Sequence, residues 1–385
     1  MGVYSYHGSN VDRFIEEDLS KIKSVVLDAI KVKSIILVGG FGKGEGLVDI
    51  KKNKITPLND YDLYLITDKN YNDKYIEDLG VKCSKAIGRG GLDFVENPGE
   101  TYDENKFFHV DLRVIPYKKL RKLLPTQRTY EIKYGSKVIY GEDVRNLIPD
   151  VKVPVSEAIR ILFNKMDHLL LAKDNHSRIK SIYISKSYTD LCSALLIFEN
   201  NYNTINKFSA TYSERNKIFQ ELNFPKELKK KVDWANKFRA NPKIIKDIDK
   251  EWEQAKYWVG YSFKYIIAKH LKLENDSWDA IANALYNKLP YVYFTPYIKN
   301  KYLFPLQYYL TLRYIRKCWS LNEKLIKPLF SWKDVGIKLA IPLILYLYGE
   351  ERQAEFYLKK ITNNVKPLKE RLLKLYGLYY LQKII

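Results

Sequence analysis

"NDYDLYLIT", residues 59–67, places two aspartates at the head of an apolar run. Tyr, Leu, Ile and Thr favour strands, and Asn59 just before them suits a turn. Because side chains alternate between the two faces of a strand, Asp60, Asp62 and Tyr64 are predicted to share one face. Two carboxylates about 7 Å apart repel each other, given a rise of ~3.3 Å per residue. The stretch therefore predicts a strand whose paired aspartates need a positively charged partner.

A glycine-rich turn precedes this strand, in "IILVGGFGKGEG" (35–46). A strand running into such a turn often binds phosphate, because glycine lets backbone N–H groups approach the oxygens. A Walker A loop is excluded because Gly44, not Ser or Thr, follows Lys43. The dinucleotide fingerprint G-x-G-x-x-G fits no register of these glycines. On its own, the stretch fits a phosphate loop or a plain tight turn.

A third carboxylate lies in "FFHVDLRVIP" (107–116), where apolar residues alternate with His109, Asp111 and Arg113. Asp111 is therefore predicted on the polar face of a second strand. Three carboxylates that converge at a glycine turn repel one another unless a cation neutralises them. Magnesium prefers oxygen ligands and commonly bridges carboxylates to substrate phosphates, so Asp60, Asp62 and Asp111 are candidate metal ligands.

These motifs together resemble the nucleotidyltransferase superfamily typified by DNA polymerase β. The resemblance rests on "GG" after a strand, "DYD" at the start of a strand, "VDLRV" and "VIYGED" (138–143), and it covers roughly residues 33–145. Two departures are a longer stretch before Asp60, predicted to form a small hairpin around "KKNK" (51–54), and Gly40 where many members have Ser.

The resemblance implies transfer of a nucleoside monophosphate from a nucleoside triphosphate to an acceptor hydroxyl, with two Mg²⁺ ions and Mn²⁺ as an alternative. Asp60 and Asp62 would bridge both ions, and Asp111 would hold one of them. The implied triphosphate contacts are the backbone of Gly39 and Gly40 and the side chains of Lys43 and Lys186.

Two further residues of the second strand, His109 and Arg113, are also candidates for a role in the site. Arg113 either forms an ion pair that steadies Asp111 or contacts substrate. His109 is read as structural, because nothing pairs it with a nucleophile.

The chain is expected to be α+β, with a mixed sheet flanked by helices in residues 1–150 and an all-helical region in residues 151–385. Whether that helical region forms one or two subdomains stays open. Helices are predicted at 11–32, 178–200, 212–222, 245–272, 277–288, 305–320, 332–348 and 351–382, with another that starts at Ser156 as N-cap. Residues 131–143 are read as a turn followed by a strand.

Charge is divided unevenly between these parts. Residues 1–150 carry 24 basic and 23 acidic side chains, and the remainder carries 41 and 22. Such asymmetry indicates a polyanionic partner, with a general compositional bias toward lysine as the alternative interpretation, and RNA is favoured over DNA as the acceptor. Lys229, Lys230 and Lys231 are candidate phosphate contacts; a solvated face is the competing interpretation.

Other classes remain open. Transfer to a protein or small molecule, or a non-catalytic nucleic-acid-binding protein on this scaffold, is the alternative. A toxin–antitoxin RNA-cleaving helical domain needs Arg and His five or six positions apart; Arg160 and His168 are eight apart.

Three scattered cysteines and the absence of a signal or spanning segment predict a cytoplasmic protein with no membrane partner. The nucleotide and the oligomeric state stay open.

Overall fold

The computed structural model describes residues 2–52, 54–58, 60–90, 103, 108–150, 152–200, 211–287, 335–360, 367–370 and 372. The chain divides into two compact units. Unit 1 comprises Met1–Glu157 with Leu171–Ala255, and unit 2 comprises Ala158–Leu170 with Lys256–Ile385. The sheet therefore shares its unit with helices that follow residue 170, although composition alone suggests a division at residue 150.

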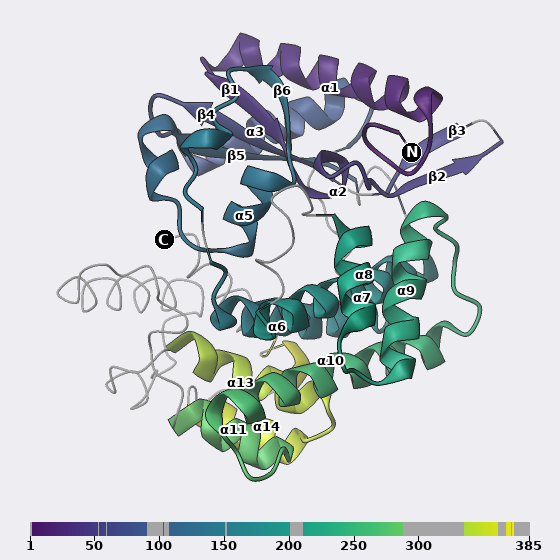
Figure 1. The fold of residues 1–385 in the computed structure, drawn as a ribbon, viewed down its shortest axis with the longest axis vertical. Coiled ribbons are helices and arrows are strands. Elements are labelled where there is room, and N and C mark those ends of the chain that lie inside the picture. The colour runs from purple at the N-terminus through teal and green to yellow at the C-terminus, as the bar shows by residue number, and fades with distance from the viewer. Residues whose placement is uncertain are drawn as a thin grey trace. The chain divides into compact units, whose positions relative to one another are not determined.

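Unit 1 is built on a four-stranded mixed sheet with the order β5-β4-β1-β6 (Figure 1). Its strands are β1 (Ser34–Leu37), β4 (Tyr61–Thr67), β5 (Val110–Pro116) and β6 (Lys137–Gly141). The central strand β4 is parallel to β5 and antiparallel to β1. The pairing of β4 with β5 sets Asp62 opposite Asp111.

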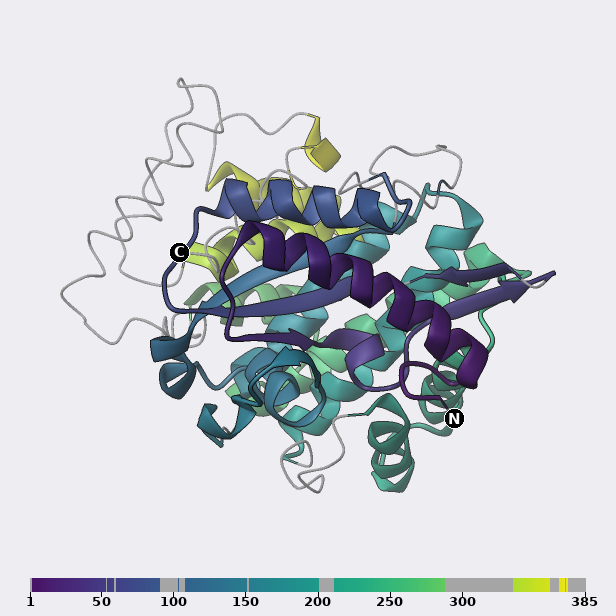
Figure 2. The ribbon, with the colours of Figure 1, turned by 90° about the horizontal axis from the view of Figure 1, so that it is seen from above.

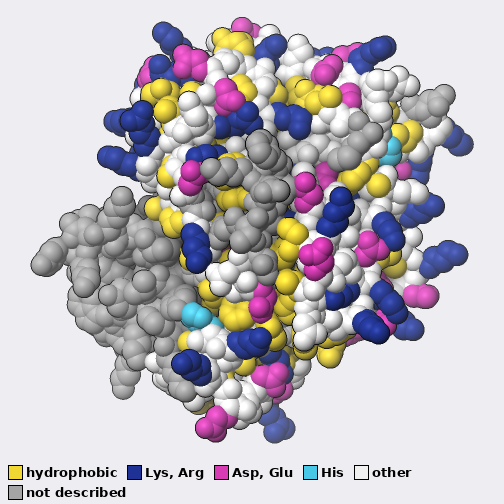
Figure 3. All heavy atoms as spheres, in the orientation of Figure 1, with side chains coloured by type: hydrophobic (Ala, Val, Ile, Leu, Met, Phe, Trp, Pro, Cys, Tyr) yellow, Lys and Arg dark blue, Asp and Glu magenta, His cyan; other side chains and the backbone are white. Residues whose placement is uncertain are grey.

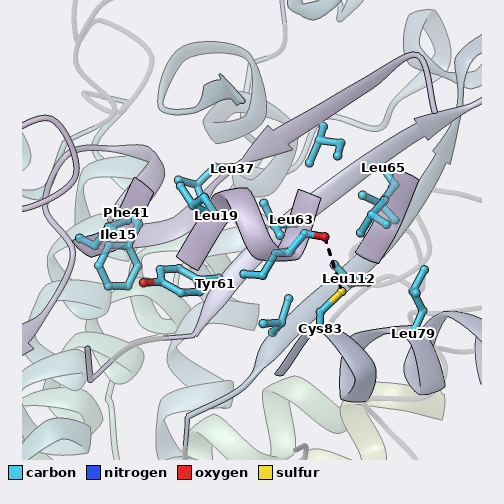
Figure 4. Packing of buried hydrophobic residues seen from close by; sticks show 14 of the residues in the cluster. Ile15, Leu19, Leu37, Phe41, Tyr61, Leu63, Leu65, Leu79, Cys83 and Leu112 are labelled. Atoms are coloured by element: carbon cyan, nitrogen blue, oxygen red, sulfur yellow. Dashed lines mark hydrogen bonds between the residues drawn. The ribbon is translucent and has the colours of Figure 1, made fainter. Parts of the chain in front are cut away.

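Two helices, α1 (Ser9–Ala29) and α3 (Asp73–Ala86), lie side by side over one face of this sheet (Figure 2). Their apolar stripes bury Ile15, Leu19 and Leu79 against alternate residues of the strands (Figure 4). From β4 this face takes Tyr61, Leu63 and Leu65. In the same core the Cys83 thiol lies 4.0 Å from the Ile22 carbonyl oxygen.

The opposite face of the sheet packs against α5 (Gln127–Tyr134) and the short helices η1 (Tyr117–Lys122) and η2 (Arg145–Leu147). This core contains Tyr64 and Ile66 of β4 with Ile132 of α5. The predicted alternation of β4 is therefore confirmed: Tyr64 lies on the face opposite to Tyr61. The glycine turn follows β1 as the short helix α2 (Gly39–Gly42).

Unit 1 also contains a hairpin and three helices. The hairpin pairs β2 (Val48–Lys51) with β3 (Lys54–Pro57), which confirms the hairpin predicted around residues 51–54. The helices are α7 (Ser177–Phe198), α8 (Tyr212–Glu221) and α9 (Lys226–Ala240), and α7 packs against both of the others. Side chains of α7 and α9 form an apolar cluster with Leu47 and Leu58 at the base of the hairpin.

In its described part, unit 2 is helical. It takes most of α6 (Val155–Ala172), α10 (Ile248–Leu271) from Lys256 onward, and α11 (Trp278–Asn287), α13 (Val335–Leu347) and α14 (Glu351–Lys359). Trp278 stacks on Tyr348 with ring centroids 4.2 Å apart, and the Tyr348 hydroxyl donates to the Lys256 carbonyl oxygen at 2.9 Å. Within the described ranges, no helix has the length and apolarity that a membrane crossing requires.

The α+β class is confirmed, and most predicted helices are present within a few residues of their expected bounds. Two local predictions are wrong. Residues 131–134, predicted as a turn, belong to α5, although the strand predicted after them is present as β6. The helix α6 begins at Val155 with Pro154 rather than Ser156 as its N-cap. The sequence reading also did not identify α9 as a helix. The predicted helix at 305–320, most of the chain beyond residue 360, Asn59 and Cys318 lie outside the described residues.

Candidate active site

Three aspartates, Asp60, Asp62 and Asp111, gather at one edge of the sheet and are called here the aspartate cluster. Asp62 and Asp111 are paired residues on the parallel strands β4 and β5, and neighbouring strands lie about 4.8 Å apart. Asp60 immediately precedes β4. The convergence that the sequence predicted for these three residues therefore holds for their backbone positions.

Tyr61 holds the two neighbouring aspartates in place. Its ring is fully buried between Phe41 and Phe108, with centroids 4.9 and 5.2 Å away. Its hydroxyl donates to Asp18 Oδ2 at 3.0 Å. Because alternate residues of a strand face opposite ways, a Tyr61 anchored on the α1 side directs Asp62 to the other face.

Each aspartate of the cluster lies near a cationic or ionisable side chain. His109 Nδ1 is 3.3 Å from Asp60 Oδ1, and Arg128 Nη1 of α5 is 3.9 Å from Asp62 Oδ1. Arg113 donates to Asp111 Oδ2 through Nε and Nη2 at 3.1 and 3.0 Å. The ion-pair reading of Arg113 is therefore confirmed, and His109, read as structural from the sequence, lies against the cluster.

The electrostatic environment of Asp60 shows that the cluster is crowded with like charge. Desolvation is the largest cause that raises the pKa of Asp60 above its ordinary value, and Asp62 and Asp111 raise it further. His109 and Lys186 oppose this shift. Lys186 of α7 therefore lies close enough to Asp60 to act on its charge, and its role at the triphosphate stays a prediction.

The glycine turn contacts the cluster through Gly39. Its φ is +67°, a left-handed conformation that L side chains rarely adopt, and a β-carbon there would overlap the Asp62 carboxylate. Gly40 is buried, and a β-carbon there would lie 2.8 Å from Arg239 Nη2. Of the two glycines predicted to contact phosphate, Gly39 lies beside Asp62 and Gly40 lies beside Arg239.

Lys43 is placed away from solvent. Its ammonium donates to Glu131 Oε1 at 2.8 Å and lies 4.2 Å from the centre of the Tyr212 ring. Arg215 Nη2 donates to the same Glu131 oxygen at 2.8 Å. Burial alone would raise the pKa of Glu131, but Lys43 and Arg215 outweigh it and hold the pKa below its usual range. Lys43 therefore belongs to a buried ion network.

A second buried carboxylate ties the glycine turn to the helices of unit 1. Glu45 accepts hydrogen bonds from the Ser213 N–H at 3.0 Å, from the Tyr212 N–H and from the Tyr6 hydroxyl at 2.8 Å. Arg239 of α9 donates to the Glu45 carbonyl oxygen at 2.8 Å. The turn that contacts Asp62 is thus held by α8 and α9.

The three candidate lysines for phosphate binding lie on α9 and have protein partners. Lys229 donates to the Gln220 carbonyl oxygen at 2.8 Å, Lys230 pairs with Glu227 and Lys231 pairs with Glu251 at 2.6 Å. On the face drawn in Figure 3, Lys and Arg side chains lie among Asp and Glu side chains over the described surface. The phosphate role of these three lysines stays a prediction.

Among the described residues, no group of three or more His, Cys, Asp or Glu side chains is arranged to hold a metal ion. The carboxylates instead turn to His109, Arg113 and Arg128, as expected of like charges that need compensation. Their chemistry, three hard oxygen donors at paired backbone positions, still fits Mg²⁺. A site would form by rotation of these side chains away from their cationic neighbours.

The sequence did not point to several charged residues around the aspartate cluster and the glycine turn: Arg128, Glu131, Arg215 and Arg239. A signal for two of them was present, because Arg128 and Glu131 are three residues apart in "QRTYEIKY" and share one face of a helix. Interpreting residues 131–143 as a turn followed by a strand removed that face from consideration. Arg215 and Arg239 carry no local signal.

No protein-family model matches the chain, and a comparison with curated proteins finds no relative.

Proposed function

We propose that unit 1 transfers a nucleoside monophosphate from a nucleoside triphosphate to an acceptor hydroxyl. The observation that carries this proposal is the register of β4 and β5, which sets Asp62 beside Asp111 next to the left-handed Gly39. Asp60, Asp62 and Asp111 would hold Mg²⁺. When bound, the metal would neutralise charge that develops on the phosphates and would favour ionisation of the acceptor hydroxyl.

The protein's own groups divide the remaining work. The acceptor oxygen attacks the α-phosphorus, the bond to the β-phosphate bridging oxygen breaks, and pyrophosphate leaves. The hydroxyl proton passes to the Asp111 carboxylate or to water. Lys186 and Arg128 supply positive charge beside the cluster, which suits the leaving pyrophosphate.

Transfer is tested by incubating the full chain with Mg²⁺, each α-labelled nucleoside triphosphate in turn and total cellular RNA. Covalent label in RNA, lost when chelator removes the metal, is expected. Equal labelling in excess chelator would contradict the mechanism, and no labelling of RNA, protein or small molecules with any of the nucleotides would contradict transfer itself.

Replacing Lys186 with alanine is expected to weaken binding of a non-hydrolysable triphosphate by about 1–3 kcal/mol, the scale of a charge-assisted hydrogen bond. Isothermal titration with Mg²⁺ present measures the change. Lys217→Ala, at an exposed position of α8, is the matched control and should bind as the wild type does. Unchanged affinity in Lys186→Ala would remove Lys186 from the site.

Lys43→Ala addresses the other predicted lysine. Because Lys43 is buried against Glu131, we expect this variant to lose folding stability rather than nucleotide affinity alone.

A further inference from the structure

A groove of about 400 Å³ lies in unit 1 between α9 and the segment that leads into α10. It is called here the Trp234 groove, and its lining residues are Trp234, Lys237, Phe238, Asn241, Lys243, Ile244, Ile245, Lys246 and Glu251. We propose that the Trp234 groove binds one base and the flanking phosphates of single-stranded RNA. Its role as the acceptor site rests on the proposed function; its role as a binding site does not.

The aromatic wall of the groove comes from one helix. Trp234 and Phe238 are four residues apart on α9 and so lie on one face, with ring centroids 5.5 Å apart. Phe238 is buried in the cluster at the base of the hairpin, and Trp234, partly exposed, packs against the same cluster. A partly exposed ring that lines the groove and packs against an apolar cluster suits stacking with a base.

Across the groove, Ile244 exposes 51% of its surface. As a lining residue of the Trp234 groove, Ile244 offers apolar contact to the second face of a bound base. The volume of the groove is at the lower end of the range of about 300–1,000 Å³ that small-ligand sites occupy, and thus suits one base.

The charge of the rim suits phosphate. Lys237, Lys243 and Lys246 are all exposed and line the groove. The acidic lining residue, Glu251, is compensated by Lys231 at 2.6 Å and accepts a hydrogen bond from the Tyr188 hydroxyl at 2.9 Å. Lys237 pairs with Asp233 at an exposed position, where such a pair is weak and a phosphate can replace the carboxylate.

The segment that forms the second wall is held in place without a ligand. Arg178 Nη1 of α7 donates to the Pro242 carbonyl oxygen at 3.4 Å, and the Ile245 N–H donates to Ser181 Oγ at 3.1 Å. Both anchors are on α7, the helix that also carries Lys186. A preformed groove loses less freedom on binding than a loop that must first become ordered.

An acidic peptide is the competing occupant, because it would also meet the lysines. Acidic side chains have no ring that could stack on Trp234, whereas every nucleobase has a π-face. The combination of a supported tryptophan and surrounding lysines therefore favours a nucleic acid over a peptide.

The test uses the full chain and fluorescently labelled oligomers of equal length, with no nucleotide or metal: oligo(rA), the same oligomer with abasic sugars, and oligo(dA). Wild-type protein is expected to bind oligo(rA) more tightly than the abasic oligomer. Trp234→Ala should weaken oligo(rA) binding roughly 5- to 150-fold, the effect of losing one stacked base, and leave abasic binding unchanged. Trp234→Leu retains apolar packing and should lose the same preference, which guards against unfolding of the alanine variant.

The lysines are tested separately. The double variant Lys243→Glu with Lys246→Glu should weaken the binding of both RNA oligomers. The slope of log affinity against log salt concentration should fall by about 0.7 for each phosphate that the protein no longer neutralises. The control is Lys82→Glu with Lys85→Glu, at exposed positions of α3. It changes the net charge by the same amount and should weaken RNA binding less.

Equal affinity for oligo(rA) and the abasic oligomer, or an unchanged preference in both Trp234 variants, would overturn the proposal. Tighter binding of oligo(dA), or of a labelled poly-glutamate peptide, would overturn RNA as the occupant. Because binding is measured without catalysis, an inactive protein still tests the groove. Unaltered transfer to RNA by a Trp234 variant that cannot stack would leave the proposed function standing and reject the groove as its acceptor site.

Discussion

Replacing Asp62 with alanine is expected to lower the rate of nucleotide transfer at least about 1,000-fold while the protein stays folded. Charge stabilisation by a bound metal contributes several kcal/mol to such reactions, and each 1.36 kcal/mol is a factor of ten. Asp62 is the aspartate of the cluster that lies beside both Asp111 and Gly39. The measurement is initial transfer rate with saturating Mg²⁺ and nucleotide.

The control for this variant is Asp68→Ala. Asp68 follows the other end of β4, is exposed, and pairs with Lys33 at 3.4 Å, so its removal should change neither rate nor fold appreciably. The thermal transition of Asp62→Ala should match that of the wild type or rise, because a repelling carboxylate has been removed. Transfer within tenfold of the wild type in a folded Asp62→Ala protein would remove the aspartate cluster from the mechanism.

Replacing Glu131 with glutamine is expected to destabilise unit 1 by about 3–5 kcal/mol, the usual cost of breaking a buried ion pair from one side. Lys43 and Arg215 share this carboxylate, and the substitution removes the negative charge that both buried cations face. Because the network joins α5 to α8, backbone amides of both helices should lose hydrogen-exchange protection. Hydrogen exchange and urea unfolding measure the loss.

Glu227→Gln is the matched control, because Glu227 pairs with Lys230 at an exposed position and its loss should have little effect. Adding Lys43→Met to Glu131→Gln removes one of the two buried cations and should recover part of the lost stability. If Glu131→Gln is as stable as the wild type, the buried network does not hold α8 against α5.

The pH dependence of stability follows from the same carboxylate. The folded pKa of Glu131 lies below its ordinary value of about 4.3, so at mildly acidic pH the unfolded chain takes up a proton that the folded chain does not. This contribution is complete above that ordinary pKa and is lost as the pH falls through the depressed folded pKa. The stability difference between wild type and Glu131→Gln should therefore shrink in acid.

Local pattern predicted the strands and the turn that form the aspartate cluster. A period of two places Asp62 and Tyr64 on one face of β4, and Gly39 stands where φ is positive and the Asp62 carboxylate leaves no space for a β-carbon. The helix α5 was missed because its start, Thr126 as N-cap, was not recognised and its apolar face is short. With that helix, Arg128 and Glu131 were missed as well.

The sequence by itself determined the α+β class, the β4 strand with its paired aspartates and the glycine turn, because strand period and glycine conformation are local properties. Only the tertiary structure decided the partners: Lys43 is buried against Glu131, 88 residues away, while Lys186 acts on Asp60. It also decided that α7, α8 and α9 share a unit with the sheet. The physical reason is that such contacts depend on which faces pack together, and a pairing between distant residues leaves no period in the chain.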